Sequence, residues 1–253
     1  MEKSISLVLT AHQLEKEKTA VASTAVIYDV LRASSTIITA LALGAKEVIP
    51  VLEPEDARVL YEQLAQKNTC KVLLGGERNG EPISGFHLGN SPLEYTPEVI
   101  NNTTVIITTT NGTRALFNSQ KAGARNILIG GILNQTTIAS HLKNEPAVTI
   151  VCAGVQGAFA FEDFLAAGLM LDELLNDKMP YRLDDAAMSA LGLARGVKHN
   201  PALIAEGHHG RRLIAKGKKA DVDFCATVNK FSVLPVYHNN KIVLSSLSLA
   251  PDN

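Results

Sequence analysis

Two short stretches of the chain combine an apolar run, a run of hydroxyl side chains and an arginine. Residues 26–36 read VIYDVLRASST, and residues 105–114 read VIITTTNGTR. Each is the pattern of a buried strand that turns into a helix. The N–H groups at the start of a helix bind anions, and the planar fork of an arginine binds phosphate or carboxylate. We therefore expect the two turns to form one site for a multiply charged anion.

Asp29 ends the first apolar run, and its position suits a metal ligand or a nucleophile that faces a phosphate. The alternative is a turn aspartate that hydrogen-bonds the backbone two residues on. Arg32 lies beside the hydroxyl-rich helix start and is a candidate to hold an anion, although a solvated arginine is the ordinary case. The candidate substrate-binding residues are Ser34, Ser35, Thr36, Thr110, Asn111, Gly112, Thr113 and Arg114. The hydroxyls among them are also typical of helix caps and of strands.

A segment without periodicity, residues 75–97, contains Glu77 and Arg78 between glycines. A loop of this length inside a compact domain is usually functional or disordered, and its aromatic and apolar residues favour order. We interpret it as a wall of the site, with an exposed ion pair as the alternative for Glu77 and Arg78.

Glu162 and Asp163 follow a small-residue turn, CAGVQG, that ends another apolar strand. Such a turn permits close approach of a ligand. Acidic residues in the first turn of a helix are also favoured by the helix dipole without any function.

Several familiar chemistries do not fit. Cys152 is followed after five residues by Ala158, where a cysteine phosphatase requires an arginine, and the chain has neither GxGxxG nor GxxxxGK[ST] between a strand and a helix. His87, His208 and His209 could act as acids or ligands, but histidines without metal-ligand spacing are weak signals.

The composition is that of an ordinary globular protein. The chain has 253 residues, of which 46% are hydrophobic and 19% charged, with a formal net charge of −1. This balance excludes a disordered chain and a general nucleic-acid binder, so an anionic ligand must be held by local groups. Three widely spaced cysteines favour a reducing compartment. We expect no signal peptide, no membrane span and a cytoplasmic location.

Strands alternate with helices over most of the chain. The expected strands are 4–10, 26–29, 47–52, 71–74, 103–109, 126–129 and 148–152, with a closing hairpin of 233–237 and 241–244. The expected helices are 34–43, 54–66, 112–122, one capped by Asn134, 161–175, 183–196, 201–215 and 220–228.

This alternation predicts one α/β domain over residues 1–253, a three-layer α/β/α arrangement with a largely parallel or mixed sheet. The repeated strand-turn-helix plan suggests an internal duplication with halves near 1–100 and 101–253. Ligands bind at the carboxyl ends of strands in such sheets, so Asp29, Glu77, Thr110 and Gly154 are expected to converge.

Four motifs, in order, resemble the 2-phosphosulfolactate phosphatase family. They are DVLRASST at 29–36, GER at 76–78 with GFHLGNSP at 85–92, TTTNGT at 108–113, and CAG at 152–154 followed by Glu162 and Asp163. The resemblance extends over nearly the whole chain.

The resemblance implies a Mg²⁺-dependent phosphatase of the coenzyme M route that converts 2-phosphosulfolactate into 3-sulfolactate and phosphate. It makes Asp29, Arg32, Glu77 and Arg78 the candidate catalytic residues. The candidate metal ligands are Asp29, Glu77, Glu162 and Asp163, since Mg²⁺ prefers oxygen ligands. The attacking group is either water oriented by a carboxylate or Asp29 itself.

Three other functions stay open from the sequence: a non-catalytic anion-binding protein on the same scaffold, a phosphatase for another small phospho-hydroxy acid, and a sugar-phosphate isomerase or lyase. The expected partner is a small anionic phosphate ester, with no nucleic acid and no membrane. A homo-oligomer is the default expectation, because most soluble oligomers are symmetric.

Overall fold

The computed structural model describes residues 3–16, 21–67, 70–176 and 180–245. The strands are β1 (Lys3–Val8), β2 (Thr24–Tyr28), β3 (Glu47–Pro50), β4 (Lys71–Arg78), β5 (Glu81–Pro82), β6 (Thr103–Thr108), β7 (Asn126–Gly130), β8 (Ala147–Cys152), β9 (Tyr181–Leu183), β10 (Pro235–His238) and β11 (Lys241–Leu244). The α-helices are α1 (Ala11–Lys16), α2 (Ala33–Ala42), α3 (Pro54–Ala65), α4 (Pro97–Ile100), α5 (Gly112–Lys121), α6 (Gln135–Leu142), α7 (Phe161–Asn176), α8 (Asp185–Gly196), α9 (His208–Ala215) and α10 (Lys219–Cys225). The 3₁₀ helices are η1 (Pro92–Glu94), η2 (Ile132–Asn134) and η3 (Pro201–Glu206).

The described strands form one mixed sheet in the order β5-β4-β6-β3-β11-β10-β7-β2-β8-β1-β9. Two parallel blocks, β4-β6-β3 and β7-β2-β8-β1-β9, are joined by the antiparallel hairpin β10-β11. The expected closing hairpin therefore lies in the middle of the sheet. Each block takes strands from both sides of residue 100, so the division of the chain near that residue does not separate the blocks.

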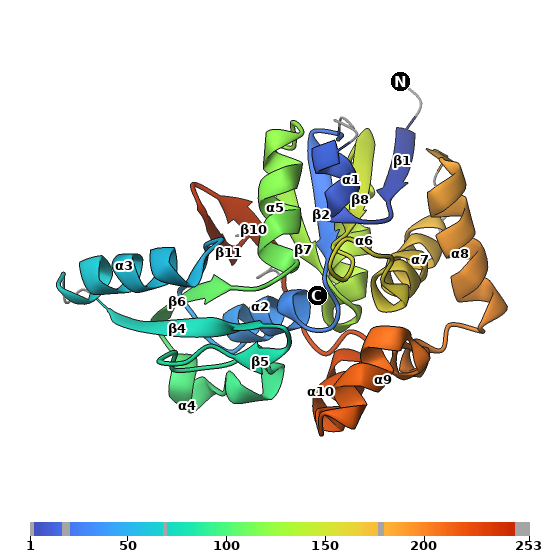
Figure 1. Ribbon diagram of the computed structural model, residues 1–253. Helices are drawn as coiled ribbons and strands as arrows, with labels where there is room; N and C mark the ends of the chain where they lie inside the picture. The colour runs from blue at the N-terminus through green and yellow to red at the C-terminus, as the bar shows by residue number, and fades with distance from the viewer. Residues whose placement is uncertain (1–2, 17–20, 68–69, 177–179, 246–253) are drawn as a thin grey trace, which may run out of the picture.

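Helices cover both faces of the sheet, which confirms the three-layer α/β/α arrangement (Figure 1). The alternation of side chains along β2 explains this burial on both sides. Val26 and Tyr28 pack into the core beneath α6, α7 and α8, whereas Ala25 and Ile27 pack into the core beneath α2 and α5. No helix within the described ranges is long and apolar enough to cross a membrane.

Most expected elements are observed within a few residues of their predicted bounds, but β4 is longer than predicted. It continues through Gly75 and Gly76 to Arg78, where the sequence suggested an irregular loop. A Cβ at Gly75 would lie 2.2 Å from the hydroxyl of Tyr95, and one at Gly76, whose φ is +136°, would lie 2.0 Å from the carbonyl oxygen of Thr108. The glycines therefore permit close approach inside the sheet, and the longer strand brings Glu77 to its carboxyl end.

Candidate active site

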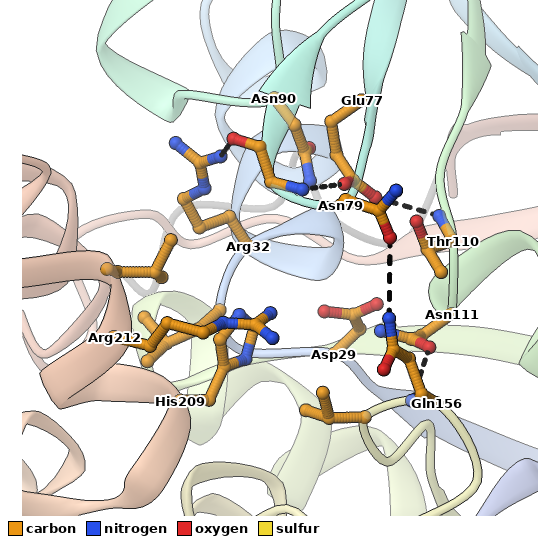
Figure 2. Close-up of a pocket in the computed structure, with 14 residues that line it drawn as sticks. Asp29, Arg32, Glu77, Asn79, Asn90, Thr110, Asn111, Gln156, His209 and Arg212 are labelled. Carbon is orange, nitrogen blue, oxygen red and sulfur yellow. Dashed lines mark hydrogen bonds between the residues drawn. The ribbon is translucent and has the colours of Figure 1, made fainter. Parts of the chain in front are cut away.

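A pocket opens where the carboxyl ends of β2, β4, β6 and β8 meet helix α9 (Figure 2). It is lined by Asp29, Leu31, Arg32, Glu77, Asn79, Gly80, Asn90, Thr110, Asn111, Val155, Gln156, His209, Arg212 and Leu213. Asp29, Glu77 and Thr110 converge here as expected, and the turn after β8 contributes the two residues that follow Gly154. Segments far apart in the sequence therefore form one polar pocket.

Asp29 is a buried carboxylate with one oxygen available. Its Oδ1 accepts a hydrogen bond from the amide of Ala33 at 3.3 Å, whereas no described residue hydrogen-bonds Oδ2. Burial raises the pKa of Asp29 to about 7, His209 opposes this rise, and the negative charge of Glu77 adds to it. The amide of Ser34 donates to the carbonyl of Asp29 at 2.8 Å. The first two N–H groups of α2, which the sequence suggested as anion donors, are therefore occupied by Asp29.

Gly112 leaves room for this carboxylate at the start of α5. A Cβ there would lie 2.8 Å from Asp29 Oδ2 and 2.8 Å from the Cβ of Ala33. We expect Gly112→Ala to reduce activity and to lower the free energy of unfolding by about 1–3 kcal/mol through overpacking, despite the higher helix propensity of alanine. The matched control is Gly192→Ala in α8, which meets nothing within 4 Å and should be neutral or slightly stabilising. Chemical denaturation and turnover of both variants test the prediction, and equal stability of the two would contradict it.

Glu77 organises the turns on either side of it. Its Oε1 accepts from the amide of Thr110 at 2.8 Å and its Oε2 from the amide of Gly80 at 2.6 Å. Across the pocket, the backbone N–H of Gln156 donates to Asn111 Oδ1 at 3.0 Å. These bonds tie together the turns that follow β4, β6 and β8.

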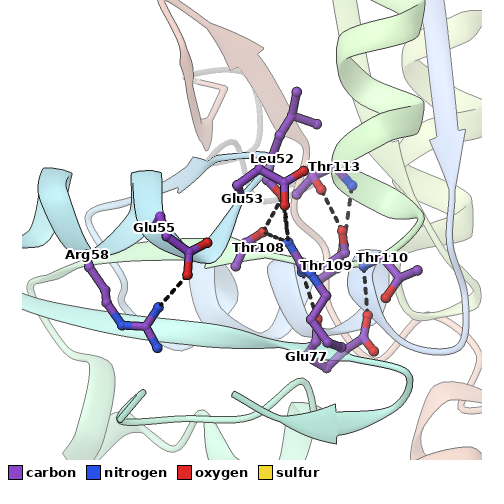
Figure 3. A network of polar contacts seen from close by, with 10 residues as sticks. Leu52, Glu53, Glu55, Arg58, Glu77, Thr108, Thr109, Thr110 and Thr113 are labelled. Carbon is purple, nitrogen blue, oxygen red and sulfur yellow. Dashed lines mark hydrogen bonds and ion pairs between the residues drawn. The ribbon is translucent and has the colours of Figure 1, made fainter. Parts of the chain in front are cut away.

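Arg78, a predicted catalytic residue, does not line the pocket with Glu77. It donates to the carbonyl of Leu52 at 2.6 Å and to the hydroxyl of Thr108 at 2.8 Å, and it lies 3.8 Å from the carboxylate of Glu53. Figure 3 shows the network of Leu52, Thr108 and Glu77. Neighbouring side chains of a strand point to opposite faces, so Glu77 and Arg78 cannot both face the pocket.

Arg32 reaches the pocket and is held there by a buried acid from α10. Its guanidinium forms an ion pair with Asp221 Oδ2 and donates to the carbonyl of Gly80 at 3.2 Å. The hydroxyl of Ser91 donates to the other carboxylate oxygen of Asp221 at 2.7 Å. Both charged side chains are almost fully buried. Asp221 thus neutralises Arg32 and fixes its position.

Removal of Asp221 should therefore be costly. Loss of one partner of a buried ion pair leaves an uncompensated charge, so Asp221→Ala is expected to lower the free energy of unfolding by about 3 kcal/mol or more. Asp223→Ala on the same helix is the control, because Asp223 pairs with Lys219 in solvent and such pairs contribute about 0–1 kcal/mol. Urea denaturation of both variants measures the difference. Similar values for the two would show that the buried pair does not stabilise the fold.

Four of the predicted substrate-binding hydroxyls are buried and lie outside the pocket lining. Ser34 accepts from the amide of Asp29, Ser35 donates to the carbonyl of Val30, and Thr36 donates to the carbonyl of Asn90. Thr113 donates to the carbonyl of Thr109 at 2.8 Å. Three of these hydroxyls bond backbone groups of their own turn and Thr36 bonds a distant one, so the structure does not bring the four into the pocket lining.

Arg114 lies on the exposed side of α5 and faces a second hollow of about 290 Å³. That hollow shares Thr110, Asn111 and Gln156 with the pocket of Asp29. Arg114 is thus a neighbour of the predicted site and does not line it.

Glu162 and Asp163 lie behind the pocket and are absent from its lining. Asp163 accepts from the amides of Val30 at 2.8 Å and Gly154 at 3.1 Å, so both of its oxygens hold turns of the site. Glu162 Oε1 lies 2.9 Å from His209 Nδ1. Burial, and then the neighbouring Glu162, raises the pKa of Asp163 well above its usual value. Neither side chain lines the pocket, so the structure does not bring these two candidate metal ligands together with Asp29 and Glu77.

The pocket offers hard oxygen donors. Asn90 Oδ1 and Thr110 Oγ1 are buried without a hydrogen-bond partner in the described structure, and both residues line the pocket beside Asp29 and Glu77. Within the described ranges, no group of three or more His, Cys, Asp or Glu side chains is placed to hold a metal ion. The donor set fits Mg²⁺, which binds through one or two carboxylates, waters and a substrate phosphate.

Sequence reasoning named His209 of α9 only as a weak candidate and did not name Arg212. His209 and Arg212 both line the pocket, and the guanidinium of Arg212 makes no hydrogen bond or ion pair with any residue in the described ranges. A pair of residues three apart in a helix shares one face, so the pattern HHGRR at 208–212 contained this signal. Lys216 at the end of α9 pairs with Glu81 at 2.7 Å, which docks the helix beside the turn after β4.

The pocket contains two carboxylates, Asp29 and Glu77, and two arginines, of which Arg32 is paired with an acid and Arg212 has no partner among the described residues. This combination on an α/β fold defines a site for a small anionic substrate. Comparison with known proteins agrees with this class: residues 8–240 match the family described as 2-phosphosulpholactate phosphatase. A protein of Caldanaerobacter subterraneus named "probable 2-phosphosulfolactate phosphatase" is 42% identical over 85% of this chain and 87% of its own length. Proteins of the same name from Clostridium novyi, at 37% over 94% and 98%, and Thermotoga maritima, at 39% over 87% and 92%, are also similar. The chain belongs to the 2-phosphosulfolactate phosphatase family.

Proposed function

We propose that this protein is a Mg²⁺-dependent phosphatase that hydrolyses 2-phosphosulfolactate to 3-sulfolactate and phosphate. The observation that carries the proposal is the presence, in one pocket, of the carboxylates of Asp29 and Glu77 and the guanidinium of Arg212. The acids suit a divalent cation, and the arginine suits the anionic groups of a phospho-hydroxy acid. The family membership supports the same substrate class.

The residues of the chain have separate roles in this proposal. Asp29 and Glu77 would hold Mg²⁺, with the amide oxygen of Asn90 beside them. When bound, the ion would polarise the phosphoryl oxygens and neutralise charge. Arg212 binds an anionic group of the substrate, and Arg32, fixed by Asp221, adds positive charge to the wall. Their charge favours the transition state because these groups are already oriented before the reaction.

A phosphate-release assay over a panel of 2-phospho-hydroxy acids tests this function. We expect release from 2-phosphosulfolactate with Mg²⁺, loss of release with a chelator, and recovery when excess Mg²⁺ is restored. The matched control replaces the carboxylate of the substrate with an amide, which should weaken binding. Tight substrate binding without phosphate release in either metal condition would instead indicate an anion-binding protein.

The cellular setting is part of the proposal. We place the enzyme in the cytoplasm and in the coenzyme M route. All three cysteines are free thiols, which is consistent with a reducing compartment. Detection of the chain in the cytosolic fraction of cells that produce it tests the location.

A further inference from the structure

His209 and Glu162 form a buried pair at the edge of the pocket. His209 Nδ1 lies 2.9 Å from Glu162 Oε1, and the two side chains are 10% and 2% exposed. The histidine lines the pocket (Figure 2). The glutamate is not part of the lining, so its carboxylate supports the ring from outside the pocket. No described residue hydrogen-bonds His209 Nε2.

This arrangement determines what the imidazole can do. A carboxylate at Nδ1 fixes a proton on Nδ1 and orients the ring, which leaves Nε2 as the nitrogen that can exchange a proton with a ligand. Glu162 Oε2 is buried without a hydrogen-bond partner in the described structure. Among the described residues, His209 is therefore the side-chain partner of a carboxylate that burial leaves poorly solvated, and this carboxylate compensates a positive charge on the ring.

Hydrolysis of a phosphate ester of an aliphatic alcohol requires a proton donor, because an alkoxide is a poor leaving group. Arg32 and Arg212 do not give up protons in proteins. Carboxylates that hold a metal ion are deprotonated, so Asp29 and Glu77 cannot be the proton donor in the proposed enzyme. Among the titratable side chains that line the pocket, His209 remains.

We propose that His209 is the general acid that protonates the leaving oxygen, and that Glu162 is its positioning residue. The assignment rests on the proposed phosphatase function and names a step within it. As the bond between phosphorus and the ester oxygen breaks, its electron pair stays on that oxygen, which takes the proton from Nε2. Water supplies the new oxygen on phosphorus, and a proton released from that water restores the imidazolium. The products are the 2-hydroxy acid and inorganic phosphate.

The test compares two esters that differ only in the substituents on C3, and therefore in the acidity of the leaving alcohol: 2-phospholactate and its 3,3,3-trifluoro analogue. Fluorine stabilises the departing alkoxide, so this ester needs less protonation. In single-turnover measurements with Mg²⁺, His209→Gln should slow 2-phospholactate cleavage by about 10²–10⁴-fold and the trifluoro ester much less. Glu162→Gln should also slow cleavage of 2-phospholactate more than cleavage of the trifluoro ester, with a smaller loss of rate than His209→Gln. His208→Gln, an exposed neighbour on α9, is the control and should behave as the wild type.

The outcomes separate the two proposals. A loss of equal size for both esters in His209→Gln and Glu162→Gln would overturn the general-acid assignment while leaving the phosphatase function intact. If the wild type releases no phosphate from either ester or from 2-phosphosulfolactate, the proposed function fails and the assignment fails with it. Circular dichroism and thermal melting check that each variant is folded. If His209→Gln does not fold, Glu162→Gln tests the assignment.

Discussion

Arg212→Ala is expected to lower kcat/KM for 2-phosphosulfolactate by about 10²–10³-fold, the usual cost of removing one preorganised charged donor from an active site. Arg212 lines the pocket without an acid partner in the described structure, so its positive charge is available to the substrate. Arg32, in contrast, is already paired with Asp221. Inhibition by inorganic phosphate should weaken in parallel, because the same guanidinium binds the product.

The neighbour Arg211 provides a matched control. It is exposed and donates to the carbonyl of Glu206 at the end of η3, so Arg211→Ala should change kcat/KM little. Arg212→Lys keeps the charge but loses the planar fork, and an intermediate rate is expected. A nearly normal rate for Arg212→Ala would show that Arg212 contacts neither the substrate nor the product.

Asp29→Asn is expected to abolish most activity while leaving the protein folded. A bound metal ion supplies several kcal/mol of transition-state stabilisation, and about 4 kcal/mol corresponds to about a thousandfold in rate. Loss of the carboxylate charge should weaken Mg²⁺ binding as well, so titration of the variant with Mg²⁺ should give a higher half-saturating concentration. Asp223→Asn changes one exposed carboxylate in the same way and should keep normal kinetics.

Although Asp29→Asn should lose activity, its stability in metal-free buffer should equal or exceed that of the wild type. The pKa of Asp29 is about 7 in the folded protein, above its usual value, so the folded state binds a proton that the unfolded state has lost. The free energy of unfolding therefore falls as the pH rises from about 4 through 7. Asn carries no charge, so Asp29→Asn should melt at an equal or higher temperature than the wild type at pH 8. A lower melting temperature together with normal activity would contradict the proposed role.

Labelled water separates the two forms of attack that remain open for Asp29. In a single turnover in water enriched in heavy oxygen, direct attack on phosphorus places the label in the released phosphate. Label in the enzyme and none in the phosphate would rule out direct attack and would indicate a covalent bond between Asp29 and phosphorus.

The sequence alone determined the alternation of elements and the strand ends that contain Asp29 and Thr110. These features follow from local periodicity: a strand buried on both faces is continuously apolar, and the residues that follow it must turn toward the edge of the sheet. It also indicated the family, because four motifs keep their order along the chain.

The tertiary structure decided which polar side chains face the pocket. Glu77 and Arg78 are adjacent in sequence, but the extension of β4 through two glycines turns the carboxylate inward and the guanidinium outward. The hydroxyls of Ser34 and Ser35 bond the backbone of their own buried turn, and that of Thr36 bonds the carbonyl of Asn90. His209 and Arg212 come from a helix far along the chain that docks beside Gly80, and Asp221 comes from the next helix. Such contacts depend on long-range packing, which local periodicity does not encode, and they alone complete the pocket around Asp29.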